Sequence, residues 1–158
     1  MKNIQLIASD IDGTLLLNGS QAIDPEIFNL IHKLQQKGIL FMAASGREYT
    51  NLRNLFSPVA DDIAYLCLNG CLTFYKGKCI SKEVMDTNLA RKLIKIIQNE
   101  PNAEVLVSGE KTCYITLKNQ SYYEHLTNTV QNHVTIVDDL LNIPEPYTKI
   151  SAYFKDGV

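Results

Sequence analysis

The sequence of 158 residues predicts an α/β fold, in which a Rossmann-like parallel sheet precedes a second domain of mixed α and β structure. Three observations support this prediction. Apolar and amphipathic segments alternate as strand, helix, strand, helix, strand over residues 4–68. Polar, glycine-containing clusters follow the three apolar segments. The alternation then gives way to hairpins and isolated helices, so we expect one domain over 1–79 and another over 80–158.

The first domain is expected to open with a strand over residues 4–8. Apolar side chains alternate onto both faces of this segment, which is typical of a parallel-sheet strand covered on both sides. Asp24-Pro25-Glu26 predicts a helix start, because it offers an N-cap carboxylate, a proline at the first helical position and an acidic first turn. Gly38 predicts the end of this helix, because glycine readily adopts the left-handed conformation found after helix C-termini.

Two more buried strands are expected over residues 39–44 and 63–68. Between them the sequence predicts a helix that buries Tyr49, Leu52 and Phe56. Strands and helices in this succession favour right-handed crossovers between parallel strands.

After residue 70 the sequence predicts a hairpin over 72–80 with a Lys76-Gly77 turn, at the end of the first domain. The second domain is expected to be α+β. Its predicted elements are a helix over 88–98, strands over 104–107 and 112–117, a helix begun by a capping box at Ser121-Tyr122-Tyr123-Glu124, and strands over 134–137 and 147–154.

Composition limits the possible partners of the chain. A formal charge of −2 does not favour nucleic acid, which basic patches attract. No apolar run is long enough to span a bilayer, and too few residues precede Asp10 to form a signal peptide. We therefore expect a soluble cytoplasmic protein with no membrane partner. Its four cysteines form no CxxC pair and are expected to be free thiols.

In an open α/β sheet, ligands bind outside the carboxyl ends of the strands. Three polar clusters follow the predicted strands of the first domain: Asp10-Ile11-Asp12-Gly13-Thr14, Ser45-Gly46-Arg47 and Asn69-Gly70. We expect them to converge on one site.

The first cluster has the residues needed for phosphoryl chemistry. Asp10 and Asp12 are two residues apart, so an extended backbone would project both carboxylates to one side. One carboxylate can attack phosphorus, while the other protonates the leaving alkoxide and later deprotonates water. Gly13 allows a tight turn that brings backbone amides near phosphate oxygens. The alternative is a solvated turn or an unrelated cation site, but the preceding buried strand and the following Gly-Thr favour the catalytic interpretation.

The other two clusters offer groups that bind anions. Ser45 and Gly46 provide a hydroxyl and amides before a predicted helix, and Arg47 adds a fixed positive charge. Asn69 provides a donor and an acceptor. The alternatives are that Ser45 only caps the helix, that Arg47 is an ordinary surface residue, and that Asn69-Gly70 is only a turn.

As a set, these residues resemble the haloacid dehalogenase (HAD) superfamily, and in particular its Cof-like phosphatases with an α/β cap of the IIB type. Asp10-Ile11-Asp12-Gly13-Thr14 matches the first motif of that family, DxDGT, in full. Ser45-Gly46-Arg47 matches the second motif, with serine in place of threonine. The resemblance covers essentially the whole chain, so it implies a HAD-like Rossmannoid core followed by a cap.

The resemblance also implies roles for the site residues. Asp10 would be the nucleophile and a Mg²⁺ ligand, and Asp12 the general acid/base, with its backbone carbonyl on the metal. Ser45 would hold the transferring phosphoryl group, beside Gly13, Thr14 and Gly46. Arg47 and Asn69 would lie near the phosphate and the substrate entrance.

The sequence departs from the family pattern after residue 80. Family members supply a lysine and a later Gly-Asp-x-x-Asn-Asp-like strand end, and neither is expected here. Lys149 falls in a predicted strand of the cap, and Asp138-Asp139 in a predicted turn. We therefore expect an incomplete core and cap, with an exposed sheet edge that would allow homo-oligomers.

The predicted function is Mg²⁺-dependent hydrolysis of small phosphomonoesters, such as sugar phosphates or nucleotides, through an aspartyl phosphate. Two alternatives keep the same motifs. One is a catalytically silent protein that binds phosphate, and the other is a phosphoryl transferase similar to phosphomannomutase.

Overall fold

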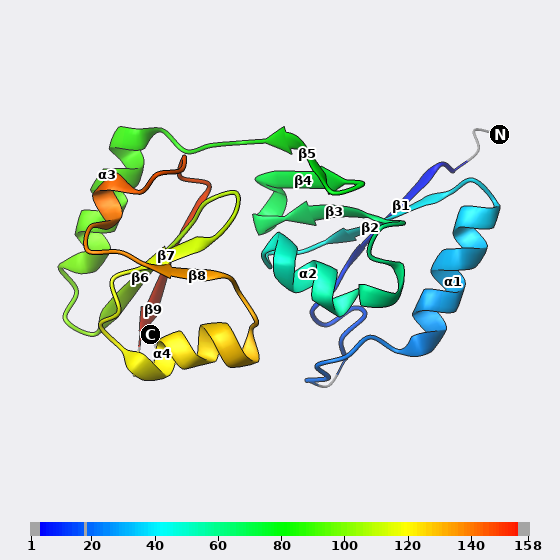
Figure 1. The fold of residues 1–158 in the computed structure, drawn as a ribbon, viewed down its shortest axis with the longest axis horizontal. Helices are drawn as coiled ribbons and strands as arrows, with labels where there is room; N and C mark the ends of the chain where they lie inside the picture. The colour runs from blue at the N-terminus through cyan, green and yellow to red at the C-terminus, as the bar shows by residue number, and fades with distance from the viewer. Residues whose placement is uncertain (1–3, 18, 155–158) are drawn as a thin grey trace. The chain divides into compact units, whose positions relative to one another are not determined.

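The computed structural model describes residues 4–17 and 19–154. They belong to two compact units, Met1–Lys82 and Glu83–Val158. Both units combine helices with sheets (Figure 1), which confirms the predicted α/β class.

The first unit is built on a five-stranded sheet with the order β1-β2-β3-β4-β5. Strands β1 (Leu6–Asp10), β2 (Leu40–Ala44) and β3 (Ala64–Cys67) are parallel. Because sequential neighbours in a parallel sheet require crossovers, the two intervening helices follow from this order. The predicted alternation of strands and helices is thus confirmed.

An antiparallel hairpin completes this sheet. It consists of β4 (Leu72–Tyr75) and β5 (Lys78–Lys82). Lys76 and Gly77 form the turn with φ values of 49° and 72°. Two consecutive positive φ values are those of a type I′ turn, which suits the twist of a two-residue hairpin. The predicted Lys-Gly turn is confirmed.

Helix α1 (Pro25–Gln36) begins and ends as its sequence predicts. The Asp24 carboxylate accepts a hydrogen bond from the backbone N–H of Glu26 at 2.8 Å, and proline occupies the first turn. Gly38 follows the C-cap with a φ of 72°. Helix α2 (Tyr49–Leu55) is shorter and is followed by a 3₁₀ turn, Ser57–Val59.

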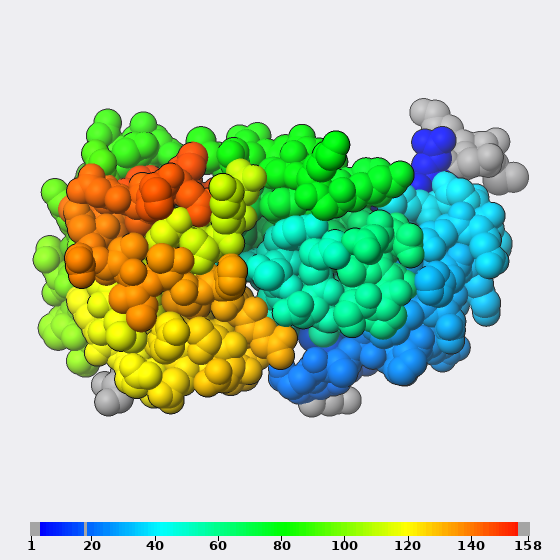
Figure 2. Space-filling view, viewed as in Figure 1, coloured from blue at the N-terminus to red at the C-terminus, as the bar shows by residue number. Residues whose placement is uncertain are grey.

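The two helices bury their apolar sides in one core. Phe56, which is fully buried, contacts Phe28 of α1 edge-on at 6.3 Å and Phe41 of β2 at 6.0 Å. In the space-filling view the 3₁₀ turn after α2 lies next to α1 on the visible face of this unit (Figure 2). Aromatic contacts of this kind stabilise the core beyond the effect of the apolar area that each ring buries.

The expectation that the first strand is covered on both faces is wrong. β1 lies at the edge of the sheet, Leu6 is 47% exposed, and Ala8 and Asp10 are also exposed. The apolar pattern predicts burial on two faces, but in the described residues only Ile7 packs against the core from this strand.

The second unit is a four-stranded sheet with the order β8-β7-β6-β9. Its strands are β6 (Ala103–Ser108), β7 (Cys113–Ile115), β8 (Val134–Ile136) and β9 (Lys149–Phe154). Helix α3 (Thr87–Gln98) is capped by Asp86, whose carboxylate accepts from the N–H of Leu89. A 3₁₀ turn, Leu140–Asn142, precedes β9.

Alternate residues of β6 contact different clusters. Val105 and Val107 pack with Ile94 of α3. Leu106, which points to the other face, packs with Tyr122 and Leu126. Both faces of β6 are thus covered within this unit.

The predicted capping box at Ser121 is wrong. Helix α4 (Gln120–Glu124) already includes Ser121, and it continues as a π-helical turn, His125–Thr129. The N-cap is Asn119, whose side-chain oxygen accepts from the N–H of Tyr122 at 3.2 Å and from the Ser121 hydroxyl at 2.7 Å. Asparagine is as good an N-cap residue as serine, and Asn119 precedes Ser121 in the sequence, so the helix begins before Ser121.

Among the described residues, no helix is long and apolar enough to cross a bilayer.

Candidate active site

The carboxyl ends of β1, β2 and β3 lie at one edge of the first sheet. Asp10, the last residue of β1, is in register with Ala44, the last residue of β2. Ala44 is in turn in register with Leu66 of β3. The segments that begin at Ile11, Ser45 and Leu68 therefore leave the sheet side by side.

Backbone hydrogen bonds join the second and third of these segments. The N–H of Ser45 donates to the carbonyl of Leu66 at 2.9 Å. The N–H of Leu68 donates to the carbonyl of Arg47 at 3.1 Å, and the N–H of Asn69 donates to the carbonyl of Ser45 at 3.2 Å. Asn69 is thus held next to Ser45, although the two residues are 24 positions apart in the sequence.

The turn after β3 has an unusual backbone. Leu68, Asn69 and Gly70 have φ values of 53°, 59° and 99°. Leucine rarely adopts a positive φ, and such strain is retained where surrounding contacts enforce it, often at functional sites. Here the hydrogen bonds to Arg47 and Ser45 hold the strained turn in place.

Asp10 is exposed at the end of β1. Its Oδ2 atom accepts a hydrogen bond from the hydroxyl of Thr14 at 3.3 Å. The carbonyl of Ile11, a fully buried residue, accepts from the N–H groups of Thr14, Leu15 and Leu16. This buried anchor folds the DxDGT segment back, so that Thr14 reaches Asp10.

Gly13 forms the tight turn of this segment. Its φ of 81° requires glycine at this point. Its N–H, however, donates to the carbonyl of Leu16 at 3.0 Å, so the amide is engaged within the turn. Gly13 therefore shapes the segment through its backbone conformation.

Asp12 and Arg47 form an ion pair between the first and second segments. Arg47 donates from Nη2 to Oδ1 of Asp12 at 2.6 Å and from Nε to Oδ2 at 3.0 Å. Its Nη1 donates to the side-chain oxygen of Asn51 at 3.0 Å. Asn51 lies on α2 and is only 6% exposed, so it fixes the guanidinium from behind. Sequence reasoning missed Asn51, although its position four residues after Arg47 would place it one turn along a helix.

This pair shifts the titration of both groups. The Arg47 hydrogen bonds hold the pKa of Asp12 below its ordinary value, although partial burial raises it, and the Ser45 side chain acts in the same direction as Arg47. The hydrogen bonds to Asp12 likewise raise the pKa of Arg47. Asp12 is therefore held as the carboxylate when no substrate is bound.

Ser45 does not lie at a helix N-terminus, which corrects the sequence-based expectation. Helix α2 begins four residues later, with Glu48 as its N-cap residue. The Ser45 hydroxyl oxygen instead accepts from the N–H of Arg47 at 3.3 Å. Gly46 lies between these two residues, so the Ser-Gly-Arg segment is a tight turn beside the end of β1.

The carboxylate oxygens at the site are ligands of the type that Mg²⁺ binds. Mg²⁺ is usually bound through one or two carboxylates and substrate phosphate, and it keeps several waters. Asp10 offers an exposed carboxylate of this type, and Asp12 is two residues away. In the described part of the chain, no group of three or more His, Cys, Asp or Glu residues is placed to hold a metal.

Comparisons with known proteins agree on one family. The profile of a family described as haloacid dehalogenase-like hydrolase matches residues 7–157. The 5-amino-6-(5-phospho-D-ribitylamino)uracil phosphatase YbjI of Escherichia coli is 23% identical over 98% of this chain and 57% of its own length. Phosphoglycolate phosphatase 1 of Saccharolobus solfataricus is 38% identical over 48% of this chain and 33% of its own.

Solved structures give the same result for the fold. A crystal structure from Eubacterium rectale superposes with a TM-score of 0.83 and 26% identity, over 96% of this chain and 58% of that one. The HAD subclass IIB sugar phosphatase BT4131 superposes with a TM-score of 0.72 and 18% identity, over 90% and 56%. The chain thus spans little more than half the length of these proteins.

Proposed function

Because this chain belongs to the haloacid dehalogenase-like hydrolase family, we propose that it carries the nucleophile and the general acid/base of a phosphatase. The observation that carries this proposal is the alignment of Asp10, Ser45 and Leu68 at one edge of the sheet, with Arg47 bridging back to Asp12. The relatives with assigned activities are phosphatases, which supports the same reaction class.

In the first step a carboxylate oxygen of Asp10 attacks phosphorus. A P–O bond to Asp10 forms as the bond to the ester oxygen breaks, and the carboxyl of Asp12 gives its proton to the departing alkoxide. Asp10 is suited to this role because its side chain is exposed and its carboxylate accepts a hydrogen bond from the Thr14 hydroxyl.

In the second step water attacks the aspartyl phosphate. Asp12, now a carboxylate, takes a proton from the water, and inorganic phosphate leaves with Asp10 regenerated. The Arg47 hydrogen bonds that lower the pKa of Asp12 oppose its role as an acid. Arg47 would therefore turn from Asp12 toward the substrate phosphate in the complex, where its guanidinium can form a bidentate pair of hydrogen bonds with the phosphate oxygens.

Asp10 and the backbone carbonyl of Asp12 would hold Mg²⁺, which would offset negative charge on the phosphoryl oxygens. Ser45 and Asn69 would bind the oxygens of the transferring group, since their segments are hydrogen-bonded to each other.

The substrate class that we propose is a small phosphomonoester, of the sugar phosphate or nucleotide type. The net charge of −2 gives no general attraction for polyanions. The names of two relatives refer to a phosphorylated ribitylaminouracil and to phosphoglycolate. We further propose that residues 1–79 are the start of the catalytic core and that residues 80–158 begin a cap domain.

One observation favours a second function, binding of phosphate without turnover. Both carboxylate oxygens of Asp12 are occupied by Arg47, so the general acid/base is engaged. A chain that kept this pair with a ligand bound would retain the site but not the reaction.

Hydrolysis of p-nitrophenyl phosphate by this chain separates the two functions. We expect Mg²⁺-dependent phosphate release that Asp10→Asn and chelator abolish. Asp61→Asn is the matched control, because Asp61 is exposed and pairs with Arg53 outside the site. Equal release by all three proteins would overturn the phosphatase proposal, and phosphate binding without release would favour the second function.

A further inference from the structure

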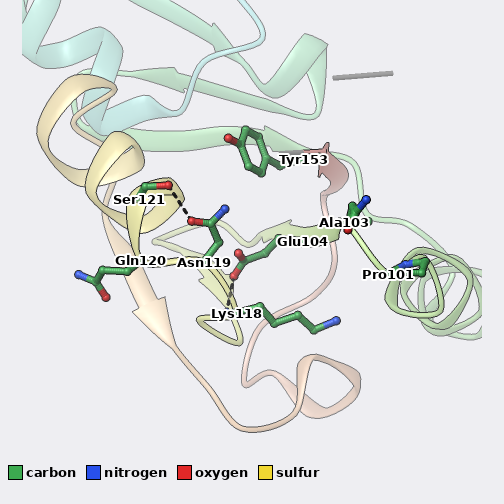
Figure 3. A pocket seen from close by; sticks show the side chains of 9 residues that line it. Pro101, Ala103, Glu104, Lys118, Asn119, Gln120, Ser121 and Tyr153 are labelled. Carbon is green, nitrogen blue, oxygen red and sulfur yellow. Dashed lines mark hydrogen bonds between the residues drawn. The ribbon is translucent and has the colours of Figure 1, made fainter. Parts of the chain in front are cut away.

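The second unit contains an open cavity of about 450 Å³ on the face of its sheet that Tyr122 covers. It lies between the start of β6, the end of β9 and the start of α4 (Figure 3). The polar residues that line it include Glu104, Lys118, Asn119 and Ser121. None of them belongs to the phosphatase motifs.

Glu104 is the unusual residue of this cavity. It is only 2% exposed, and its Oε1 atom accepts from the backbone N–H of Lys118 at 2.9 Å. Its Oε2 atom is buried and has no hydrogen-bond partner among the described residues. Figure 3 shows this carboxylate in the middle of the lining residues. Buried carboxylate oxygens are almost always hydrogen-bonded, so an unpaired one indicates a missing donor.

The walls around Glu104 are fixed. Tyr153 is its register partner on β9, so both side chains project from the same face of the sheet. The Tyr153 ring stacks on Tyr122 at 4.0 Å with an angle of 8°. Asn119 is fixed by its capping hydrogen bonds to Ser121 and Tyr122. A ligand would therefore enter a site that is already shaped.

The charges of Glu104 and Lys118 indicate which charged groups a ligand of this cavity would have. A glutamate carboxylate only accepts hydrogen bonds, so Oε2 requires a donor, and a protonated amine is the donor that also compensates its charge. Lys118 lines the same cavity and is exposed, and it forms no ion pair with Glu104. A second positive charge disfavours a purely cationic ligand, so the ligand needs an anionic group as well.

We propose that this cavity binds a small zwitterion of the amino-acid type, with its ammonium group on Glu104 Oε2 and its carboxylate near Lys118. The site shares no residue with the proposed phosphatase site and does not depend on the function proposed for that site. Asn119 and Ser121 provide further polar groups for the ligand.

Backbone NMR titration of the whole chain tests the proposal with three related probes. L-serine has both charged groups, ethanolamine has only the ammonium, and N-acetyl-L-serine has only the carboxylate. We expect L-serine to shift the amide signal of Lys118, which bonds to Glu104, and to do so saturably. We expect at least tenfold weaker binding of the other two probes.

Glu104→Gln keeps the size of the side chain and an acceptor for Lys118, but it replaces Oε2 by a donor. It should abolish the serine-dependent shift, whereas Glu100→Gln, at an exposed residue of the same unit, should not. If Glu104→Gln fails to fold, Lys118→Met provides the second variant. It should remove the preference for L-serine over ethanolamine. No saturable shift with L-serine, or an equal shift with N-acetyl-L-serine, would overturn the proposal and leave a cavity that holds water only.

Discussion

Arg47 and Asp12, which are 35 residues apart, share two hydrogen bonds at 2.6 and 3.0 Å. The pair connects the segment after β1 with the segment after β2. A third hydrogen bond, from Nη1 of Arg47 to the side-chain oxygen of Asn51 on α2, orients the guanidinium beside the Asp12 carboxylate when no substrate is bound.

Replacing Arg47 should weaken phosphate binding far more than it weakens the fold. Arg47→Lys keeps the charge but loses the bidentate hydrogen bonds of the guanidinium. We therefore expect inorganic phosphate to bind about tenfold more weakly, which is a loss of about 1.4 kcal/mol in binding free energy. The unfolding free energy should change by less than about 1 kcal/mol, because the Asp12 side chain is 57% exposed. Calorimetric titration and urea denaturation measure the two quantities.

Arg53→Lys is the control for this prediction. Arg53 pairs with Asp61 at 2.9 Å in the same unit, outside the site. An equal loss of phosphate affinity in both variants would show that Arg47 has no specific role.

Gly13→Ala tests whether the DxDGT turn matters for function beyond its backbone strain. A Cβ atom at Gly13 would meet nothing within 4 Å, so the cost comes only from the φ of 81°, about 1–2 kcal/mol. Gly38, with a φ of 72° and equally open space, provides a matched control. Both variants should lose similar stability, but only Gly13→Ala should lower the hydrolysis of p-nitrophenyl phosphate. Equal activities would contradict this account.

The sequence predicted those features of the site that depend on local pattern. Asp24 and Gly38 set the limits of α1 through their own backbone preferences, and DxDGT after an apolar strand located Asp10. The burial of β1 was not predictable in the same way, because a run of apolar residues does not reveal which faces of a strand other elements cover. Likewise, the burial of Glu104 and the hydrogen bond that its Oε1 accepts from the N–H of Lys118 depend on segments that only the fold brings together.

Glu145 should make the second unit more stable at neutral than at acidic pH. Partial burial raises the pKa of this carboxyl, but hydrogen bonds from Tyr114 and from the N–H groups of Lys111 and Glu110 outweigh burial and lower the pKa below 4.5. A lowered folded pKa stabilises the fold above the unfolded value and loses that stabilisation as pH falls through the folded value.

Urea denaturation from pH 7 down to about pH 3 measures this effect against Glu145→Gln. The wild type should be more stable than the variant at pH 7, and the difference should shrink below about pH 4.5. A difference that is constant or grows toward acidic pH would contradict the role of the ionised carboxylate.

The four cysteines should differ in their reactivity. Burial raises the pKa of Cys67 to about 12, and Cys113 is also buried, with its Sγ donating to the carbonyl of His133. Cys71 and Cys79 are partly exposed. Iodoacetamide at about pH 8 should therefore modify the partly exposed pair first, since alkylation requires an accessible thiolate. Peptide mass spectrometry reads out the order, and early modification of Cys67 would contradict the packing of β3.

The proposed role of Asp10 as the nucleophile can be tested by trapping its phosphorylated form. The p-nitrophenolate group leaves without an acid, so Asp12→Asn should slow only the hydrolysis of the acyl phosphate, and the intermediate should accumulate. After acid quenching, peptide mapping should find the phosphoryl group on Asp10, removable by hydroxylamine, and the Asp10→Asn/Asp12→Asn double variant should carry none. A phosphoryl group on another residue, or phosphate release by the double variant at the wild-type rate, would contradict the account.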